Sequence, residues 1–242
     1  MTAEPENPFP LASPAEANPA PPPAADPAHT EDLILAQLRN RDLPADEIES
    51  ISKNSTATKS RKVRIALATH PRTPRRLALR LIRELYTFDL MQFTLQPAAA
   101  ADLKRVADEL LVARLASVSL GERISFARRC SGSVAAALLI DKESRVWRTA
   151  LENPRLTEAA IVKVLQRPGA TPAFVDAVCH HAKWSLRLEI RLALLRNPHT
   201  PLVQALEFAR RLPPPVLRDI LHASRLPEKI KNYLREDLKA RT

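Results

Sequence analysis

The densest group of basic side chains in the sequence falls between residues 61 and 83. It comprises Arg61, Lys62, Arg64, Arg76, Arg80 and Arg83. The last three are four and three residues apart, so a helix would place them on one face. Guanidinium groups arranged in this way bind phosphates or carboxylates. The group therefore indicates a surface for nucleic acid or for an acidic peptide, although a plain solvated helix face explains it equally well.

A second candidate binding group lies near residue 190. Trp184, Arg187 and Arg191 are spaced so that one helical stripe would hold all three. An indole ring beside two arginines could stack on a base or hold a phosphate. The alternative is a tryptophan in the core, with the aliphatic stems of the arginines packed against it.

Neither the cysteines nor the histidines have the spacing of a metal site. Cys179, His180 and His181 are consecutive, and neighbouring helical positions diverge by about 100°. No CxxC or HxxxH pattern accompanies them. We therefore expect no metal and no cofactor, with the two histidines at a helix C-terminus. Cys130 and Cys179 suit buried thiols in a reducing compartment.

The sequence has no recognisable catalytic motif. Its only glycines are Gly121, Gly132 and Gly169, too far apart for a phosphate-binding loop. G-x-S-x-G, HExxH and paired-carboxylate patterns are absent. We identify no catalytic residue, and a non-enzymatic protein is the favoured interpretation.

Charge is distributed unevenly along the chain. Residues 1–60 carry 4 Lys/Arg against 10 Asp/Glu, a net of −6, and residues 61–242 carry 33 against 17, a net of +16. The basic part favours acidic or phosphate-bearing partners, although arginine also serves helix formation and solubility. The acidic segment could fold back onto the basic part and compete with such partners.

Composition divides the chain into three regions. Residues 1–29 contain nine prolines and are predicted to be a disordered acidic tail. Residues 30–60 are predicted to form short helices, with a linker over 53–60, and residues 61–242 to form a helical domain. With 3 glycines and 4% aromatic residues, the chain lacks the composition of a β protein, so the predicted class is all-α.

One phrase recurs in the basic region. Each copy combines an apolar helix, a polar residue, a proline that ends the helix, and a threonine expected to cap the next one. The copies are VRIALATHPRTP at 63–74, VWRTALENPRLTE at 146–158 and IRLALLRNPHTP at 190–201. Thr73, Thr157 and Thr200 are the predicted caps, and Thr171 is a fourth. The proline spacing predicts a repeat of about 40–45 residues with one degenerate copy, or half-units of about 22–24 residues.

Amphipathic periodicity predicts helices throughout this region except over 88–97, which is read as a connection. The last helix should turn Ile230, Tyr233, Leu234 and Leu238 inwards.

The recurring phrase resembles the HEAT-like and leucine-rich-repeat-variant α-solenoids over residues 61–212. This resemblance implies a right-handed, curved stack of helix pairs whose concave face binds proteins or nucleic acids. The iron-sulfur cysteine cluster of the founding leucine-rich-repeat-variant protein is absent. Some HEAT-like proteins are DNA glycosylases, and Asp141, Trp147 and Trp184 supply the residue types that such an enzyme uses, without that family's local sequence.

Together these features predict a helical-repeat scaffold that binds a protein partner through its concave or basic face. The alternative is a nucleic-acid-binding protein, including a HEAT-like repair glycosylase, that uses the arginine stripes. The N-terminus has no secretory signal, and no apolar run reaches the length of a membrane span. We therefore expect a soluble, cytoplasmic protein with no membrane partner.

Overall fold

A computed structural model describes residues 27–241 and shows an all-α protein, which confirms the predicted class. Sixteen α-helices and one 3-10 helix form this part of the chain, which contains no strand. The first eight are α1 Pro27–Gln37, α2 Ala45–Lys53, α3 Ser55–Lys59, α4 Arg61–Thr69, α5 Arg75–Glu84, α6 Thr87–Leu95, α7 Ala101–Arg114 and α8 Leu120–Arg129. The others are η1 Leu115–Ser117, α9 Gly132–Leu138, α10 Ser144–Leu151, α11 Glu158–Leu165, α12 Pro172–Cys179, α13 Leu188–Leu194, α14 Leu202–Arg210, α15 Pro214–Ala223 and α16 Glu228–Arg241.

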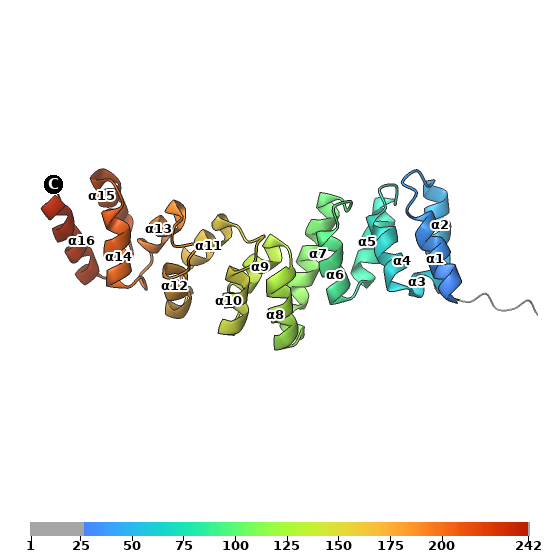
Figure 1. Cartoon of the computed structure of the whole chain (residues 1–242), viewed down its shortest axis with the longest axis horizontal. Helices are drawn as coiled ribbons and strands as arrows, with labels where there is room; N and C mark the ends of the chain where they lie inside the picture. The colour runs from blue at the N-terminus through green and yellow to red at the C-terminus, as the bar shows by residue number, and fades with distance from the viewer. Residues whose placement is uncertain (1–26, 242) are drawn as a thin grey trace, which may run out of the picture.

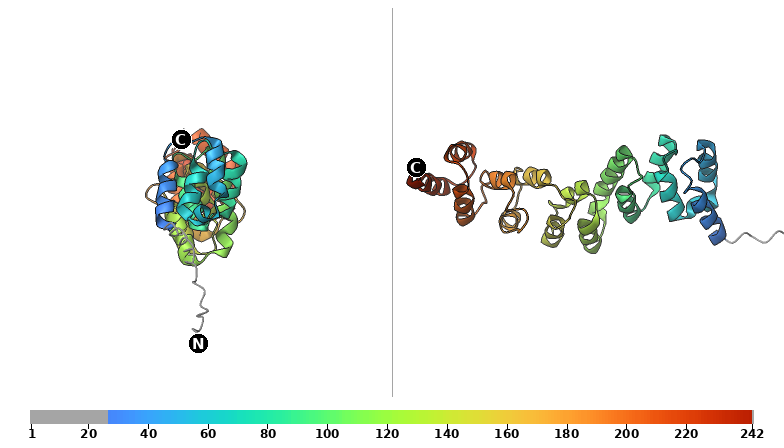
Figure 2. Two further views of the ribbon diagram at one scale, coloured as in Figure 1. Left: turned by 90° about the vertical axis from the view of Figure 1, so that its right-hand side faces the viewer. Right: turned by 45° about the horizontal axis from the view of Figure 1, so that its top comes forward.

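The helices follow one another in a row, with α1 at one end and α16 at the other (Figure 1). Seen from the end, the row is narrow, and seen from the side it is long (Figure 2). Contacts join helices that are close in sequence, as in α4 with α5, α6 with α7, α8 with α10 and α11 with α13. Distant parts of the chain therefore act on each other only through the helices between them.

The hydrophobic core runs through the row in two clusters that meet within α7. Leu103 and Ala107 belong to the N-terminal cluster, and Leu111 belongs to the C-terminal one. Since these positions follow one another at helical spacing, α7 buries one end of its apolar stripe in each cluster.

The segment before residue 60 packs into the N-terminal cluster. Where the sequence predicted a linker over 53–60, the structure has helix α3, and the Asn54 side chain accepts hydrogen bonds from two of its N–H groups. Ile34 and Ile48 share a core with Leu67 of α4. Of the predicted tail, residues 1–26 lie outside the described residues, and α1 begins at Pro27, before the predicted start.

Two further expectations were wrong. The connection predicted over 88–97 contains helix α6, in which Leu90 and Phe93 are fully buried. The sequence pattern missed this helix because a charged residue, Asp89, occupies one of its buried positions, where it pairs with Arg61. Tyr233, predicted to face inwards, is 45% exposed, whereas Leu234 and Leu238 are buried. A terminal helix packs on one side only, which leaves a narrower apolar stripe than the sequence implied.

The polar residue of the recurring phrase ties successive units together. Asn197 is buried, and its Nδ2 donates to the carbonyl oxygen of Leu165, at the end of α11, at 2.7 Å. Its Oδ1 accepts the N–H of His199 at 2.9 Å. Asn153 repeats the arrangement, donating to the Ala127 carbonyl at 2.8 Å. Each asparagine therefore closes its own turn and pairs a carbonyl of the preceding unit.

In the first copy of the phrase, a histidine occupies this position. Nδ1 of His70 accepts the N–H of Arg72 at 3.3 Å, and Nε2 lies 2.9 Å from the carbonyl oxygen of Asn40. His70 is 6% exposed, so its imidazole is a structural link of the same kind as Asn153 and Asn197.

The threonines of the phrase have two different roles. Thr157 and Thr171 cap the helices that follow them, as predicted. Thr73 and Thr200 do not: each hydroxyl donates to the carbonyl oxygen six residues earlier, at 2.6 Å. The prediction of caps there was wrong because the next helix begins after a proline that follows the threonine, which leaves the hydroxyl free to pair the end of the preceding helix.

Candidate functional site

Helix α5 combines a buried apolar face with an exposed basic face. Its apolar side chains Leu77, Ala78, Leu81 and Ile82 are buried. The remaining positions hold the predicted stripe of Arg76, Arg80 and Arg83, and all three side chains are exposed. The burial of one face fixes the rotation of the helix and thereby directs the three guanidinium groups to solvent.

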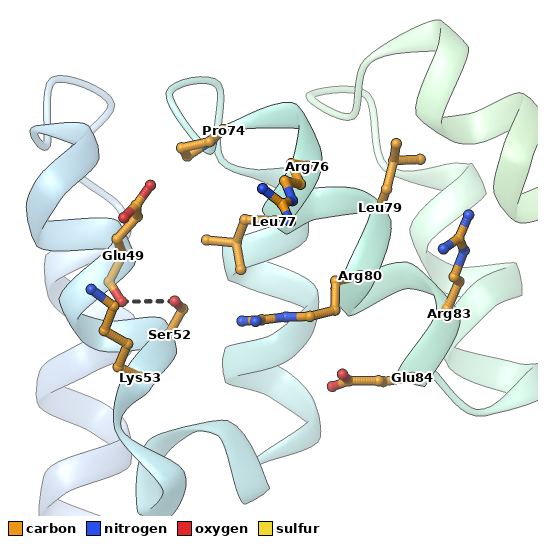
Figure 3. Close-up of a pocket in the computed structure, with 10 residues that line it drawn as sticks. All are labelled: Glu49, Ser52, Lys53, Pro74, Arg76, Leu77, Leu79, Arg80, Arg83 and Glu84. Carbon is orange, nitrogen blue, oxygen red and sulfur yellow. Dashed lines mark hydrogen bonds between the residues drawn. The ribbon is translucent and has the colours of Figure 1, made fainter.

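These arginines line an open groove of about 720 Å³ between α2 and α5. Figure 3 shows Arg80 extending from α5 across the space towards Ser52 and Lys53 of α2. Leu77, Leu79 and Pro74 provide an apolar lining, while Glu49 and Glu84 add carboxylates. The groove can therefore accommodate an extended or helical segment that carries both acidic and apolar groups.

The basic groups of the groove have no partner within residues 27–241. The side chains of Arg76, Arg80, Arg83 and Lys53 form no hydrogen bond or ion pair with the described part of the chain. Their neighbour Arg75 differs, because it pairs with Asp102 of α7. Four cationic groups at one groove are thus available for an external ligand.

The other half of the predicted cluster is engaged within the protein. Arg61 forms a bidentate pair with the buried Asp89, at 2.9 Å and 2.7 Å, and this hydrogen-bonded carboxylate raises the pKa of the guanidinium. Lys62 pairs with Glu31 at 3.2 Å. Arg64 donates to a backbone carbonyl of α5 at 3.3 Å. Arg61 and Arg64 also flank the ring of Tyr86, at 5.3 Å and 5.6 Å. These residues join α4 to its neighbours.

The second predicted stripe does not form a surface site. Trp184 is 2% exposed, and its indole N–H donates to the carbonyl oxygen of Leu151 at 2.8 Å. Nε of Arg191 donates to the Ser185 carbonyl at 2.6 Å. Arg187 alone is exposed. The ring is therefore a core residue, in agreement with the alternative interpretation, and is not available for stacking.

The cysteines and histidines form no metal centre in the part of the chain that the structure describes. His180 follows the last residue of α12, as expected for a helix end, and its Nδ1 lies 2.9 Å from the Asp176 carbonyl oxygen. Burial raises the pKa of the Cys130 and Cys179 thiols to about 12, and nearby carboxylates contribute. Both thiols are therefore neutral and unreactive near neutral pH.

The residue types that suggested a glycosylase are engaged within the protein. Asp141 pairs with Arg123 at 3.2 Å, and its side chain is 11% exposed. Trp147 is buried and packs edge-on against Phe174, with ring centroids 5.6 Å apart. An acid paired in this way and two buried tryptophans do not form a base-binding pocket.

Sequence reasoning missed Lys53 as part of the groove, because it begins the segment that was interpreted as a linker. The available signal was the amphipathic run from Ala45 to Lys53, in which Ile48 and Ile51 mark the buried side.

Comparison with known proteins gives no relative: the sequence matches no protein-family model and no curated protein, and the fold matches no solved structure. Among residues 27–241, no helix has the length and apolar character needed to cross a membrane.

Proposed function

We propose that this chain is a non-enzymatic, right-handed α-solenoid of HEAT-like helix pairs that binds an acidic segment of a protein partner in the groove between α2 and α5. The observation that carries the proposal is the set of three exposed arginines, Arg76, Arg80 and Arg83, which line an open groove and whose side chains have no partner among residues 27–241.

The recurring phrase supports the repeat architecture. Asn153 and Asn197 occupy the same position in two copies of the phrase, and each donates to a carbonyl near the end of a helix in the preceding unit, Ala127 on α8 and Leu165 on α11. A buried link of this kind, repeated along a row of helices whose contacts are local, is what stacked helix pairs require.

The lining of the groove favours a peptide over a nucleic acid. Glu49 and Glu84 would repel a continuous phosphate backbone, whereas a peptide can place acidic side chains opposite the arginines and apolar ones against Leu77 and Leu79. No aromatic side chain lines the groove, so it offers no stacking platform for bases.

The test is fluorescence anisotropy with a labelled peptide that alternates glutamate and leucine. Duplex and single-stranded DNA of matched charge serve as competing probes. The variant R76Q/R80Q/R83Q removes the basic face, and R145Q/K163Q/R218Q removes the same charge from exposed positions outside the groove. Since three exposed ion pairs are lost, we expect the first variant to weaken peptide binding by about tenfold or more and the second by less than about twofold.

Two results would contradict the proposal. Equal losses in both triple variants would show that net charge and not the groove attracts the peptide. Tighter binding of DNA than of peptide, with a steep salt dependence that disappears in R76Q/R80Q/R83Q, would assign the groove to nucleic acid instead.

The acidic N-terminal segment is a predicted competitor for this groove. Residues 31–60 contribute to the core, so removal of residues 1–60 would also strip buried side chains such as Ile34 and Ile48. Deletion of residues 1–26 tests the idea without that damage. Stronger peptide binding by the shortened chain would support competition, and unchanged binding would exclude it.

A further inference from the structure

Three arginines recur at a fixed interval in the C-terminal half of the chain. Arg167, Arg196 and Arg225 are each 29 residues apart. Each follows the last residue of a helix by two positions, because α11 ends at residue 165, α13 at residue 194 and α15 at residue 223. Each arginine therefore lies in the turn that follows its helix, and α11, α13 and α15 follow one another along the row (Figure 1).

All three arginines line one cavity of about 480 Å³. The rest of its wall is made of helix ends and turns, with His199 as the only other ionisable side chain. In contrast to the groove at α5, no Asp or Glu lines this cavity. The turns that follow α13 and α15 are joined at this cavity by a backbone hydrogen bond, in which the N–H of Arg225 donates to the carbonyl oxygen of Arg196 at 3.2 Å.

The carbonyl groups at the neighbouring helix ends already have hydrogen-bond donors other than these arginines. The Leu165 carbonyl at the end of α11 already accepts from Asn197, at 2.7 Å, and the Leu195 carbonyl accepts from the Ser224 hydroxyl, at 2.6 Å. The guanidinium groups of Arg167, Arg196 and Arg225 have no hydrogen bond or ion pair with the described residues, and all three side chains are exposed. Three unpaired cations thus repel one another around one cavity, an arrangement that a multivalent anion would stabilise.

From this cluster we infer a second binding site, independent of the proposed peptide groove, for a linear polyphosphate group. Guanidinium groups pair phosphate oxygens in bidentate fashion, and three of them around a cavity of this size favour a compact ligand with several charges over a single phosphate. The ring of His199 and the amide of Gln166 supply further hydrogen-bonding groups at the wall. This cavity has no carboxylates in its lining and is smaller than the groove at α5, so it suits a different ligand from the acidic peptide proposed for that groove.

Isothermal titration calorimetry with sodium tripolyphosphate tests the site, with orthophosphate and a nucleoside triphosphate as parallel probes. The variants are R196Q, at the centre of the cluster, and R167Q/R196Q/R225Q. The controls are R145Q/K163Q/R218Q, which has the same net charge as the triple variant, and the groove variant R76Q/R80Q/R83Q. Urea unfolding of each variant verifies that the chain is folded.

We expect tripolyphosphate to bind at least about tenfold more tightly than orthophosphate, since it reaches several arginines at once. R196Q should lose about tenfold in affinity, because one charged contact is removed, and the triple variant should lose all measurable binding. Both control variants should bind as the unmodified chain does. A nucleoside triphosphate that binds more tightly than tripolyphosphate would assign the ligand to a nucleotide, and equal binding would assign recognition to the phosphate chain.

The site is disproved if tripolyphosphate gives no binding heat at low salt. It is also disproved if orthophosphate binds as tightly as tripolyphosphate, or if R145Q/K163Q/R218Q loses as much affinity as R167Q/R196Q/R225Q. Because the groove variant is measured in the same titrations, failure of the peptide proposal leaves this test unaffected, and the reverse also holds.

Discussion

Replacement of Asn197 by alanine should destabilise the protein strongly for a single polar substitution. The side chain is 3% exposed and links two units, donating to Leu165 O at 2.7 Å and accepting from His199 N–H at 2.9 Å. Alanine leaves the backbone in place but removes the donor for the Leu165 carbonyl and the acceptor for the His199 N–H.

The expected loss follows from what is left unpaired. The Leu165 carbonyl belongs to a residue that is 2% exposed, so losing its donor costs about 1–3 kcal/mol in unfolding free energy. The N–H of His199 lies in an exposed turn and can donate to water instead, so the loss of this hydrogen bond should cost only about 0.5–1.5 kcal/mol. The total is about 3 kcal/mol. N197D should cost more, because a carboxylate oxygen would then face the Leu165 carbonyl oxygen without a proton between them.

Urea unfolding followed by circular dichroism measures this loss. With a urea dependence of about 2 kcal/mol per molar, the midpoint should fall by more than about 1 M. Asn232 provides the control, since it is exposed on α16 and its Oδ1 accepts only from Arg235. N232A should change the unfolding free energy by less than about 0.5 kcal/mol.

An unfolding free energy of N197A within about 0.5 kcal/mol of the unmodified chain would contradict this prediction, since no buried group would then have lost its partner. His70 gives an independent check in the first unit of the repeat. H70N retains a donor and an acceptor for the same two backbone groups, so it should cost less than H70A. The opposite order would mean that packing of the imidazole matters more than its hydrogen bonds.

Two further predictions concern the thiols and the glycines. With a pKa of about 12, Cys130 and Cys179 should react with iodoacetamide at pH 8 more than about a thousandfold more slowly in the folded chain than in urea, because the thiolate fraction is that much smaller. Rapid labelling of the folded chain, followed by mass spectrometry, would contradict this. G132A should cost about 1–3 kcal/mol in urea unfolding, because the added methyl group would strike the carbonyl oxygen of Arg155. G121A, a helical position with open space around it, should be neutral or stabilising, and equal effects of the two changes would refute the packing argument.

Much of the fold was predictable because the apolar stripe of an amphipathic helix is set by residues that are close in sequence. The alternation of Arg76, Arg80 and Arg83 with Leu77 and Leu81 determines both the helix and the face that it exposes. The two helices that sequence reasoning missed are α3, which has 5 residues and is mostly polar, and α6, whose apolar residues do not form one clear stripe. Their buried positions are stabilised by contacts with α4, and a contact between separate helices leaves no periodic signal in either one.

The candidate sites required the tertiary structure for a different reason. The sequence by itself determined which residues are basic and which of them share a helical face, since that follows from residue type and spacing alone. Whether a charge is available depends on its neighbours in space. Arg61 is engaged by Asp89, 28 residues away, while Arg80 has no partner in the described chain. Arg167, Arg196 and Arg225 converge on one cavity only because successive helices stack, so the tertiary structure decided which arginines bind the protein itself and which are left to bind something else.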